Sequence, residues 1–111
     1  MRLISLKNSS EFDRVFDQGK RISSGRLSIV VAQGNGVTKV GLAVSKRVGG
    51  AVIRNRVKRV FREAFRAVAG DIRTPCDIVI LPKTLPRDTA AGEVAGDLRA
   101  ALIKAGLVGT A

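Results

Sequence analysis

The chain has 111 residues, with 20 Lys and Arg against 9 Asp and Glu, a formal net charge of +11 and a single Cys. This length fits one domain, so we expect residues 1–111 to fold as one unit. A single Cys excludes an intramolecular disulfide, and no apolar run approaches the ~20 residues that span a bilayer. The start, MRLISLKNSS, has no signal-peptide pattern, so we expect a cytoplasmic protein. The charge favours a polyanionic partner, nucleic acid first and an anionic membrane second.

The first half of the chain predicts one helix followed by two paired strands. The apolar residues of EFDRVFDQG fall at helical spacing and a glycine ends the run, which indicates a helix over about 10–18. Apolar residues then alternate along 27–31 and again along 40–44, as in strands with one buried face. The Gly-Asn-Gly turn at 34–36 lies between them, so we predict an antiparallel hairpin.

The second half predicts a long central helix, one strand and a last helix. Two glycines open the central helix, about 51–68, and Gly70 closes it. DIVILPK is a compact apolar strand ended by a proline, and helical spacing returns over about 89–105. The order of helix, two or three strands, helix, strand and helix predicts one α/β sandwich in which helices pack on a mixed sheet.

The central helix separates into two faces when projected at about 100° per residue. The apolar arc, which we expect to dock on the sheet, holds Ile53, Val57, Val60, Phe61, Ala64 and Phe65. The opposite arc holds Asn55, Lys58, Arg59, Arg62 and Arg66, with Arg54 and Arg56 at the boundary.

The cationic arc favours a nucleic-acid face over a plain solvated one. Lys58, Arg62 and Arg66 are like-charge neighbours at i,i+4, each pair destabilising by roughly 0.2–0.5 kcal/mol, and Glu63 relieves only part of this repulsion. Guanidinium groups fit phosphate and stack on bases. The glycines after Lys46 and Arg47 could present amides to phosphate, although a simple strand-to-helix turn explains them slightly better. They lack the spacing of a nucleotide-binding loop.

The sequence offers no constellation for catalysis by the protein itself. There is no His, and Cys76 therefore lacks a His partner. Asp13 and Asp17 lie one helical turn apart and could hold a cation, but solvated carboxylates explain them better. A two-metal nuclease needs several converging carboxylates. We predict no catalytic residue and no metal ligand.

Two stretches carry a family resemblance. VGLAVSKRVGGAVIRNRVKRVFREAF, residues 40–65, closely resembles the signature of the bacterial ribonuclease P protein component, and FDRVFDQGKRISS, residues 12–24, resembles that family's first helix and following strand. The resemblance implies an α/β (α+β) two-layer sandwich, with a mixed four-stranded sheet and three helices in the order α-β-β-β-α-β-α. It also implies a left-handed βαβ crossover through the central helix, against the usual right-handed rule.

The resemblance further implies a non-catalytic protein subunit. It would bind the catalytic RNA subunit of ribonuclease P and the 5′ leader of precursor tRNA, while the RNA performs Mg²⁺-dependent cleavage. No cofactor on the protein alone, no membrane and no obligate protein partner are expected. Two alternatives stay open: a general RNA-binding or ribosome-associated protein, and a small protein-only nuclease.

Carried over by position, the family motif assigns two sets of residues. The set expected to face the catalytic RNA is Lys46, Arg47, Arg54, Asn55, Arg56, Lys58, Arg59, Arg62 and Arg66. The set expected to line a leader cleft is Phe12, Phe16, Ser28, Val30, Ala43 and Ser45. From spacing alone, core packing explains the two Phe better than RNA stacking. Family members often have an aromatic where this chain has Val30, and a longer basic N-terminus than Arg2 and Lys7 provide.

Overall fold

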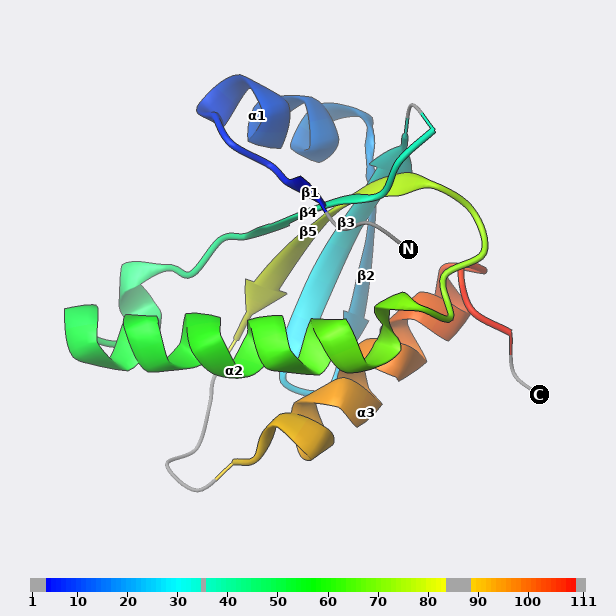
Figure 1. Cartoon of the computed structure of the whole chain (residues 1–111). Helices are drawn as coiled ribbons and strands as arrows, with labels where there is room; N and C mark the ends of the chain where they lie inside the picture. Colours follow the sequence, from blue (N-terminus) through cyan, green and yellow to red (C-terminus); the bar gives the residue numbers. More distant parts are fainter. Residues whose placement is uncertain (1–3, 35, 84–88, 110–111) are drawn as a thin grey trace.

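The computed structural model describes residues 4–34, 36–83 and 89–109. Its elements in chain order are β1 (Ile4–Ser5), α1 (Ser9–Gln18), β2 (Lys20–Ser24), β3 (Leu27–Gln33), β4 (Lys39–Leu42), the 3-10 turn η1 (Lys46–Val48), α2 (Ala51–Ala69), β5 (Cys76–Pro82) and α3 (Ala91–Lys104). The expected order of three helices and four strands is confirmed (Figure 1). The two-residue strand β1, which precedes α1, is not predicted by any pattern in the sequence.

The strands form one mixed sheet in the order β1-β4-β5-β3-β2. The predicted hairpin of β3 and β4 is wrong, because β5 lies between them. β3 pairs with β5 in an antiparallel register from Leu27↔Pro82 to Gln33↔Cys76, and β4 pairs with β5 in parallel. β3 therefore pairs along seven positions with the apolar strand β5, rather than with β4 across the local turn. Asn35, the centre of the predicted turn, lies outside the described residues.

The hairpin that does form joins β2 to β3 through Gly25 and Arg26. Ser24 pairs with Leu27, so the connection has two residues, and Gly25 has a φ of +54°. Glycine at the first turn position is the preference of a type II′ turn. Asp97 of α3 pins the turn, since its Oδ2 accepts from the Arg26 backbone N–H at 3.1 Å and from Nη1 at 2.7 Å. A Cβ on Gly25 would lie 2.5 Å from the Asp97 carboxyl carbon.

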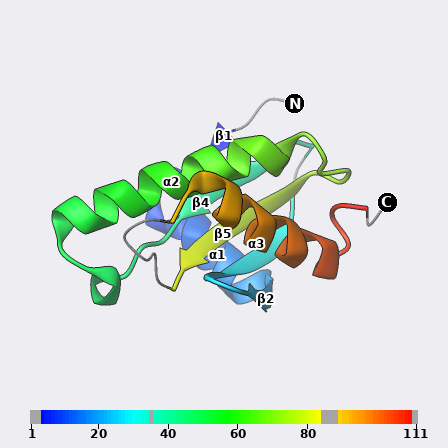
Figure 2. The same ribbon diagram turned by 90° about the horizontal axis from the view of Figure 1, so that it is seen from below.

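The crossover from β4 through α2 to β5 is left-handed, as the family resemblance implied. Figure 2 views the sheet from the face that α2 and α3 cover. With the carboxyl ends of the two parallel strands turned upward in that view, β5 lies to the left of β4. This handedness is rare among parallel strand connections. It leaves β4 near an edge of the sheet, flanked on its outer side only by β1.

Apolar side chains cover both faces of the sheet. On one face α2 and α3 pack against β3 and β5, in a cluster whose large members include Phe61, Leu27, Ile29, Ile78, Ile80, Leu98 and Leu102. On the other face α1 covers a smaller cluster of Leu6, Val15, Val30, Ala32 and Val79. The larger cluster corresponds to the predicted two-layer sandwich, and α1 adds a partial layer opposite it (Figure 1).

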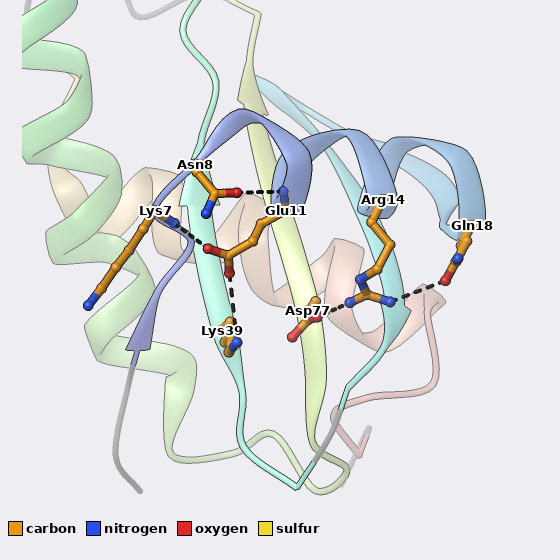
Figure 3. Close-up of polar contacts among 7 residues, drawn as sticks. All are labelled: Lys7, Asn8, Glu11, Arg14, Gln18, Lys39 and Asp77. Carbon is orange, nitrogen blue, oxygen red and sulfur yellow. Dashed lines mark hydrogen bonds and ion pairs between the residues drawn. The ribbon is translucent and has the colours of Figure 1, made fainter.

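Polar contacts hold α1 on the sheet, because Val15 is its one buried residue. Asn8 caps the helix by accepting from the Glu11 N–H at 3.0 Å, and Glu11 lies 3.7 Å from the Lys39 ammonium on β4. Arg14 pairs with Asp77 of β5, whose side chain is 8% exposed (Figure 3). The guanidinium thus neutralises a carboxylate that the sheet would otherwise bury alone.

Replacing Arg14 by Ala should destabilise the fold through this carboxylate. Fully buried pairs lose about 3–5 kcal/mol when one partner is removed, and we expect about 2 kcal/mol here because the Arg14 side chain is 36% exposed. Arg99→Ala is the matched control, since Arg99 pairs with Asp71 on the surface and should cost roughly 1 kcal/mol or less. Urea denaturation measures both, and equal losses would refute a special role for the Arg14–Asp77 pair.

Cys76 at the start of β5 gives the fold a pH dependence in the alkaline range. Burial, the neighbouring Asp77 carboxylate and, in the opposite direction, a hydrogen bond with Thr38 together raise the pKa of its thiol from 9.0 to about 11. Between these values the unfolded chain releases the thiol proton while the folded protein keeps it, so stability falls as pH rises.

Thermal unfolding followed from pH 8 to pH 11 tests this. The melting temperature of the wild type should drop more steeply above pH 9 than that of Cys76→Ala, which lacks the titrating group. Parallel pH profiles for the two proteins would show that the thiol does not contribute.

Candidate RNA interface

The orientation of α2 is set by the residues that it buries. Val57, Phe61, Ala64, Phe65 and Val68 are at most 2% exposed, which confirms most of the predicted docking arc. Two members of that arc differ: Val60 is only half-buried, and Ile53 is 48% exposed, so its predicted docking is wrong. The amino-terminal end of α2 extends with η1 past the strands, where no layer lies beneath it (Figure 1).

The segment before α2 is a tight turn that places two cations at the start of the helix. Ser45 caps η1 by accepting from the Arg47 N–H at 3.1 Å, and both Lys46 and Arg47 are exposed. Gly49 has a φ of +155°, and a Cβ there would lie 2.8 Å from Ile53. Gly50 is the N-cap of α2 and offers no side-chain cap. Phosphate binding by the amides that follow it stays a prediction.

The cations of α2 divide between an outward face and a cleft. Arg59 is exposed on the outward face, beside exposed Asn55. Half-buried Lys58 and exposed Arg62 and Arg66 lie on successive turns and form one wall of the cleft. In the described part of the chain no carboxylate pairs with these three, and Glu63 forms no ion pair with Arg59 or Arg66. The expected relief of repulsion by Glu63 is therefore not observed.

The boundary residues Arg54 and Arg56 are both half-buried. The Nε of Arg54 is buried and has no hydrogen-bond partner among the described residues. A buried, unsatisfied guanidinium nitrogen is costly, and the cost falls if a ligand atom approaches it. Arg54 is therefore half-buried on α2 and still has one unused hydrogen-bond donor, its Nε–H.

The cleft lies at the sheet edge where β1 ends. It has a volume of about 300 Å³, and we call it the edge cleft. Among the described residues β1 pairs only with Lys39 and Val40, so no strand covers the edge of β4 beside buried Gly41 and half-buried Leu42. Above this opening Phe12 packs so closely that a Cβ on Gly41 would lie 2.5 Å from its ring. The apolar lining is Leu6, Phe12, Val40, Leu42, Phe61, Phe65 and Ile80.

The edge cleft brings together members of both predicted sets. Phe12 was assigned to the leader cleft, and Lys58, Arg62 and Arg66 to the RNA-facing helix. These residues come together because β4 lies near the edge of the sheet, and the sequence did not predict that position. Ser5 and Leu6 also line the cleft and were missed, because two residues of edge strand have no detectable periodicity.

The other leader-cleft residues divide by exposure. Phe16 is 43% exposed, and Ala43 is half-buried. Ser28 and Val30 are 0% and 3% exposed, and Ser28 shares a 2.8 Å hydrogen bond with Ser23. This burial argues against direct RNA contact by either residue. Ser45 is exposed but serves as the cap of η1.

The described residues contain no group of three or more His, Cys, Asp or Glu that could hold a metal ion. Asp13 and Asp17 are both exposed on α1 and have no third acidic neighbour. Asp77, which sequence reasoning missed, is committed to Arg14. The sequence did contain one indication: an acid at the start of the apolar run DIVILP needs a partner if it is buried.

None of the helices in the described ranges is long and apolar enough to cross a membrane.

Replacing Gly49 by Ala should disturb the start of α2 and the cations around it. A positive φ and the contact with Ile53 both oppose a Cβ, so we expect a loss of about 1–3 kcal/mol. Gly50→Ala is the control, since φ is −71° and nothing lies within 4 Å of the added atom; it should cost roughly 1 kcal/mol or less. Chemical denaturation compares them, and equal losses would contradict the constraint at Gly49.

Comparison with known proteins agrees with this arrangement. The Ribonuclease P family model matches residues 1–106. The ribonuclease P protein component of Shouchella clausii is 37% identical over 102 residues, covering 90% of this chain and 84% of the relative. That of Clostridium novyi is 33% identical over 105 residues, covering 92% and 93%.

Solved structures support the fold. The RNase P protein of Staphylococcus aureus superposes with a TM-score of 0.80 at 23% identity, covering 97% of this chain and 100% of that one. The RNase P protein from Thermotoga maritima gives 0.77 at 24% identity, covering 90% and 96%. With the family model spanning nearly the whole sequence and curated relatives above 30% identity, the chain belongs to the ribonuclease P protein family of bacteria.

Proposed function

We propose that the protein is the RNA-binding subunit of a ribonuclease P ribonucleoprotein, which removes the 5′ leader from precursor tRNA. It would bind the catalytic RNA through α2 and η1, and the leader through α1 and the adjoining sheet. The observation that carries the proposal is the row of Lys58, Arg62 and Arg66 on α2, which no carboxylate of the described residues neutralises. A polyanion supplies the missing counter-charge.

The protein's contribution in this proposal is positional and electrostatic. Phosphate contacts fix register and orientation, and lysine and arginine also reduce repulsion between two RNA strands held side by side. Guanidinium groups at Arg59 and Arg62 suit phosphate because their planar fork donates two parallel hydrogen bonds. The exposed ring of Phe16 provides a stacking surface for an unpaired base of the leader.

The chemistry of cleavage is assigned to the RNA. The chain has no His, and its described residues offer no cluster of acids that fits a divalent cation. A Mg²⁺ requirement would therefore arise in the RNA partner and not on the protein. Cytoplasmic location follows from the same assignment, since precursor tRNA is processed where it is transcribed.

Reconstitution tests the proposal. The protein is mixed with a bacterial ribonuclease P RNA and a precursor tRNA at low Mg²⁺, and the products are resolved on a gel. Mature tRNA and leader should appear only with both components. Cleavage by the protein alone would favour a protein-only nuclease, and absence of any stimulation would favour a general RNA-binding protein.

Two variants make the assay specific to α2. Arg59→Ala should weaken binding of the catalytic RNA and reduce the salt slope by about 0.7–0.9 log units for a lost phosphate contact. Arg73→Ala removes the same charge from an exposed position beyond the end of α2 and should change neither quantity. Equal effects would mean that net charge, rather than the α2 face, governs binding.

A further inference from the structure

α1 crosses one face of the sheet. It joins β1 to β2, which are the two outermost strands of the described sheet, in the order β1-β4-β5-β3-β2. Both ends of the helix are tied to the sheet: before it the Leu6 N–H donates to the Val40 carbonyl at 3.0 Å, and after it Lys20 already pairs with Val31. These ties fix the path of α1. They leave its rotation about its own axis to the side chains of its middle turns.

Apolar burial sets this rotation only weakly. Val15 is the one buried residue of α1, whereas α2 buries six. Contacts between apolar groups have no preferred direction. A single valine is therefore satisfied over a range of rotations, and α1 needs a directional contact to hold one of them.

The ion pair of Arg14 with Asp77 is that directional contact. The Arg14 guanidinium uses Nη2 for the Asp77 Oδ2 on β5 and donates from Nη1 to the Gln18 Oε1 at 3.2 Å, so it is held from two sides (Figure 3). Asp77 is buried, and its Oδ1 has no hydrogen-bond partner among the described residues, so the carboxylate depends on Arg14. The second ion pair of α1, between Glu11 and Lys39, is longer at 3.7 Å, and both of its members are partly exposed.

The rotation of α1 determines where two aromatic rings lie. The Phe12 ring packs on Gly41 of β4, where an added Cβ would lie 2.5 Å from it. Phe16 follows Val15 at about 100° around the helix, and its side chain is 43% exposed. Turning α1 by one residue position would lift the Phe12 ring off Gly41 and change the side to which Phe16 points.

We propose that Arg14 and Asp77 are positioning residues for the leader of precursor tRNA. Their ion pair fixes the rotation of α1 and thereby the places of the Phe12 and Phe16 rings, while neither Arg14 nor Asp77 needs to touch the RNA. The proposal rests on the proposed function, in which the leader binds α1 and the adjoining sheet. It adds that leader recognition depends on a contact made between the helix and β5.

Reconstituted cleavage with two substrates tests the positioning role. One precursor tRNA carries a long single-stranded leader and the other a leader of one nucleotide, and the protein is added until it saturates the catalytic RNA. Asp77→Ala should raise KM for the long leader by about fivefold or more, the lower limit for losing one stacked base, with kcat unchanged. KM for the short leader should stay at the wild-type value. An unchanged KM for the long leader would overturn the proposal.

The choice of Asp77→Ala separates positioning from direct contact. This variant keeps every cation and makes the protein more positive, so a phosphate contact by Arg14 would bind the leader equally well or more tightly. Weaker binding therefore supports positioning, and tighter binding refutes it. Asp71→Ala is the matched control, because Asp71 pairs with Arg99 on the surface and its loss should leave both KM values unchanged.

A loss of stability alone is excluded by a third variant. Val94→Ala removes buried volume from α3 on the opposite face of the sheet, so it should lower the melting temperature without changing the preference for the long leader. If Val94→Ala lowers that preference as Asp77→Ala does, the effect comes from stability and the proposal is wrong. Asp77→Asn keeps the side-chain volume and should change KM in the same direction, which provides the test if Asp77→Ala does not fold.

NMR observes the position of the ring directly. The wild type should show nuclear Overhauser effects between the Phe12 ring and the Gly41 α protons, and these should weaken in Asp77→Ala and persist in Asp71→Ala. Equal intensities in all three proteins would show that the pair does not set the rotation of α1.

The wild-type protein separates this proposal from the proposed function. If the wild-type enzyme shows no preference for the long leader, the assignment of the leader to α1 fails, and the positioning role fails with it. If the wild type prefers the long leader and Asp77→Ala and Arg14→Ala keep that preference, the positioning role alone is refuted.

Discussion

The buried side of α2 is the constraint on which the rest of the protein depends. Fully burying a Val or Phe side chain contributes about 1.5–3 kcal/mol, and Val57, Phe61, Phe65 and Val68 are all buried. Each like-charge pair on the opposite side costs only about 0.2–0.5 kcal/mol. Burial therefore exceeds the repulsion by severalfold, and the helix can hold Lys58, Arg62 and Arg66 in a row although no acid of the described residues pairs with them. A less deeply anchored helix could turn about its axis, and the row would then no longer face the edge cleft.

The topology decides where that row is placed. Because the crossover carries the chain from β4 over α2 to β5, β5 occupies the centre of the sheet and β4 is pushed toward the edge. β1 covers only part of that edge, and the uncovered part becomes the edge cleft. If β3 and β4 had paired as the Gly-Asn-Gly turn predicts, β5 would not separate them and α2 would lie over a different pair of strands. The unusual connection is thus what brings Phe12, the β4 edge and the α2 cations together.

The sequence predicts the local features of this structure well and the non-local ones poorly. The bounds of α2 follow from a long periodic pattern between glycines, and its buried residues follow from the projection, except for Ile53, which is 48% exposed, and Val60, which is only half-buried. The pairing of β3 with β5 joins segments about 50 residues apart, and no local pattern records it. The same holds for Arg14 and Asp77. Ser28 and Val30 alternate as cleft residues would, but alternation identifies a face and not whether a helix covers it.

The two sides of the edge cleft are held by different forces. The α2 side rests on apolar burial, which salt does not screen. The α1 side, which carries Phe12, rests on one buried valine and on ion pairs of Arg14 with Asp77 and of Glu11 with Lys39. The more exposed Glu11–Lys39 pair weakens as ionic strength rises, because the screening length falls to about 8 Å near physiological salt, whereas the Arg14 pair with buried Asp77 is screened less. Phosphate contacts weaken under the same conditions. Salt therefore acts twice on any RNA bound here, once on its phosphates and once on the helix that positions the ring of Phe12.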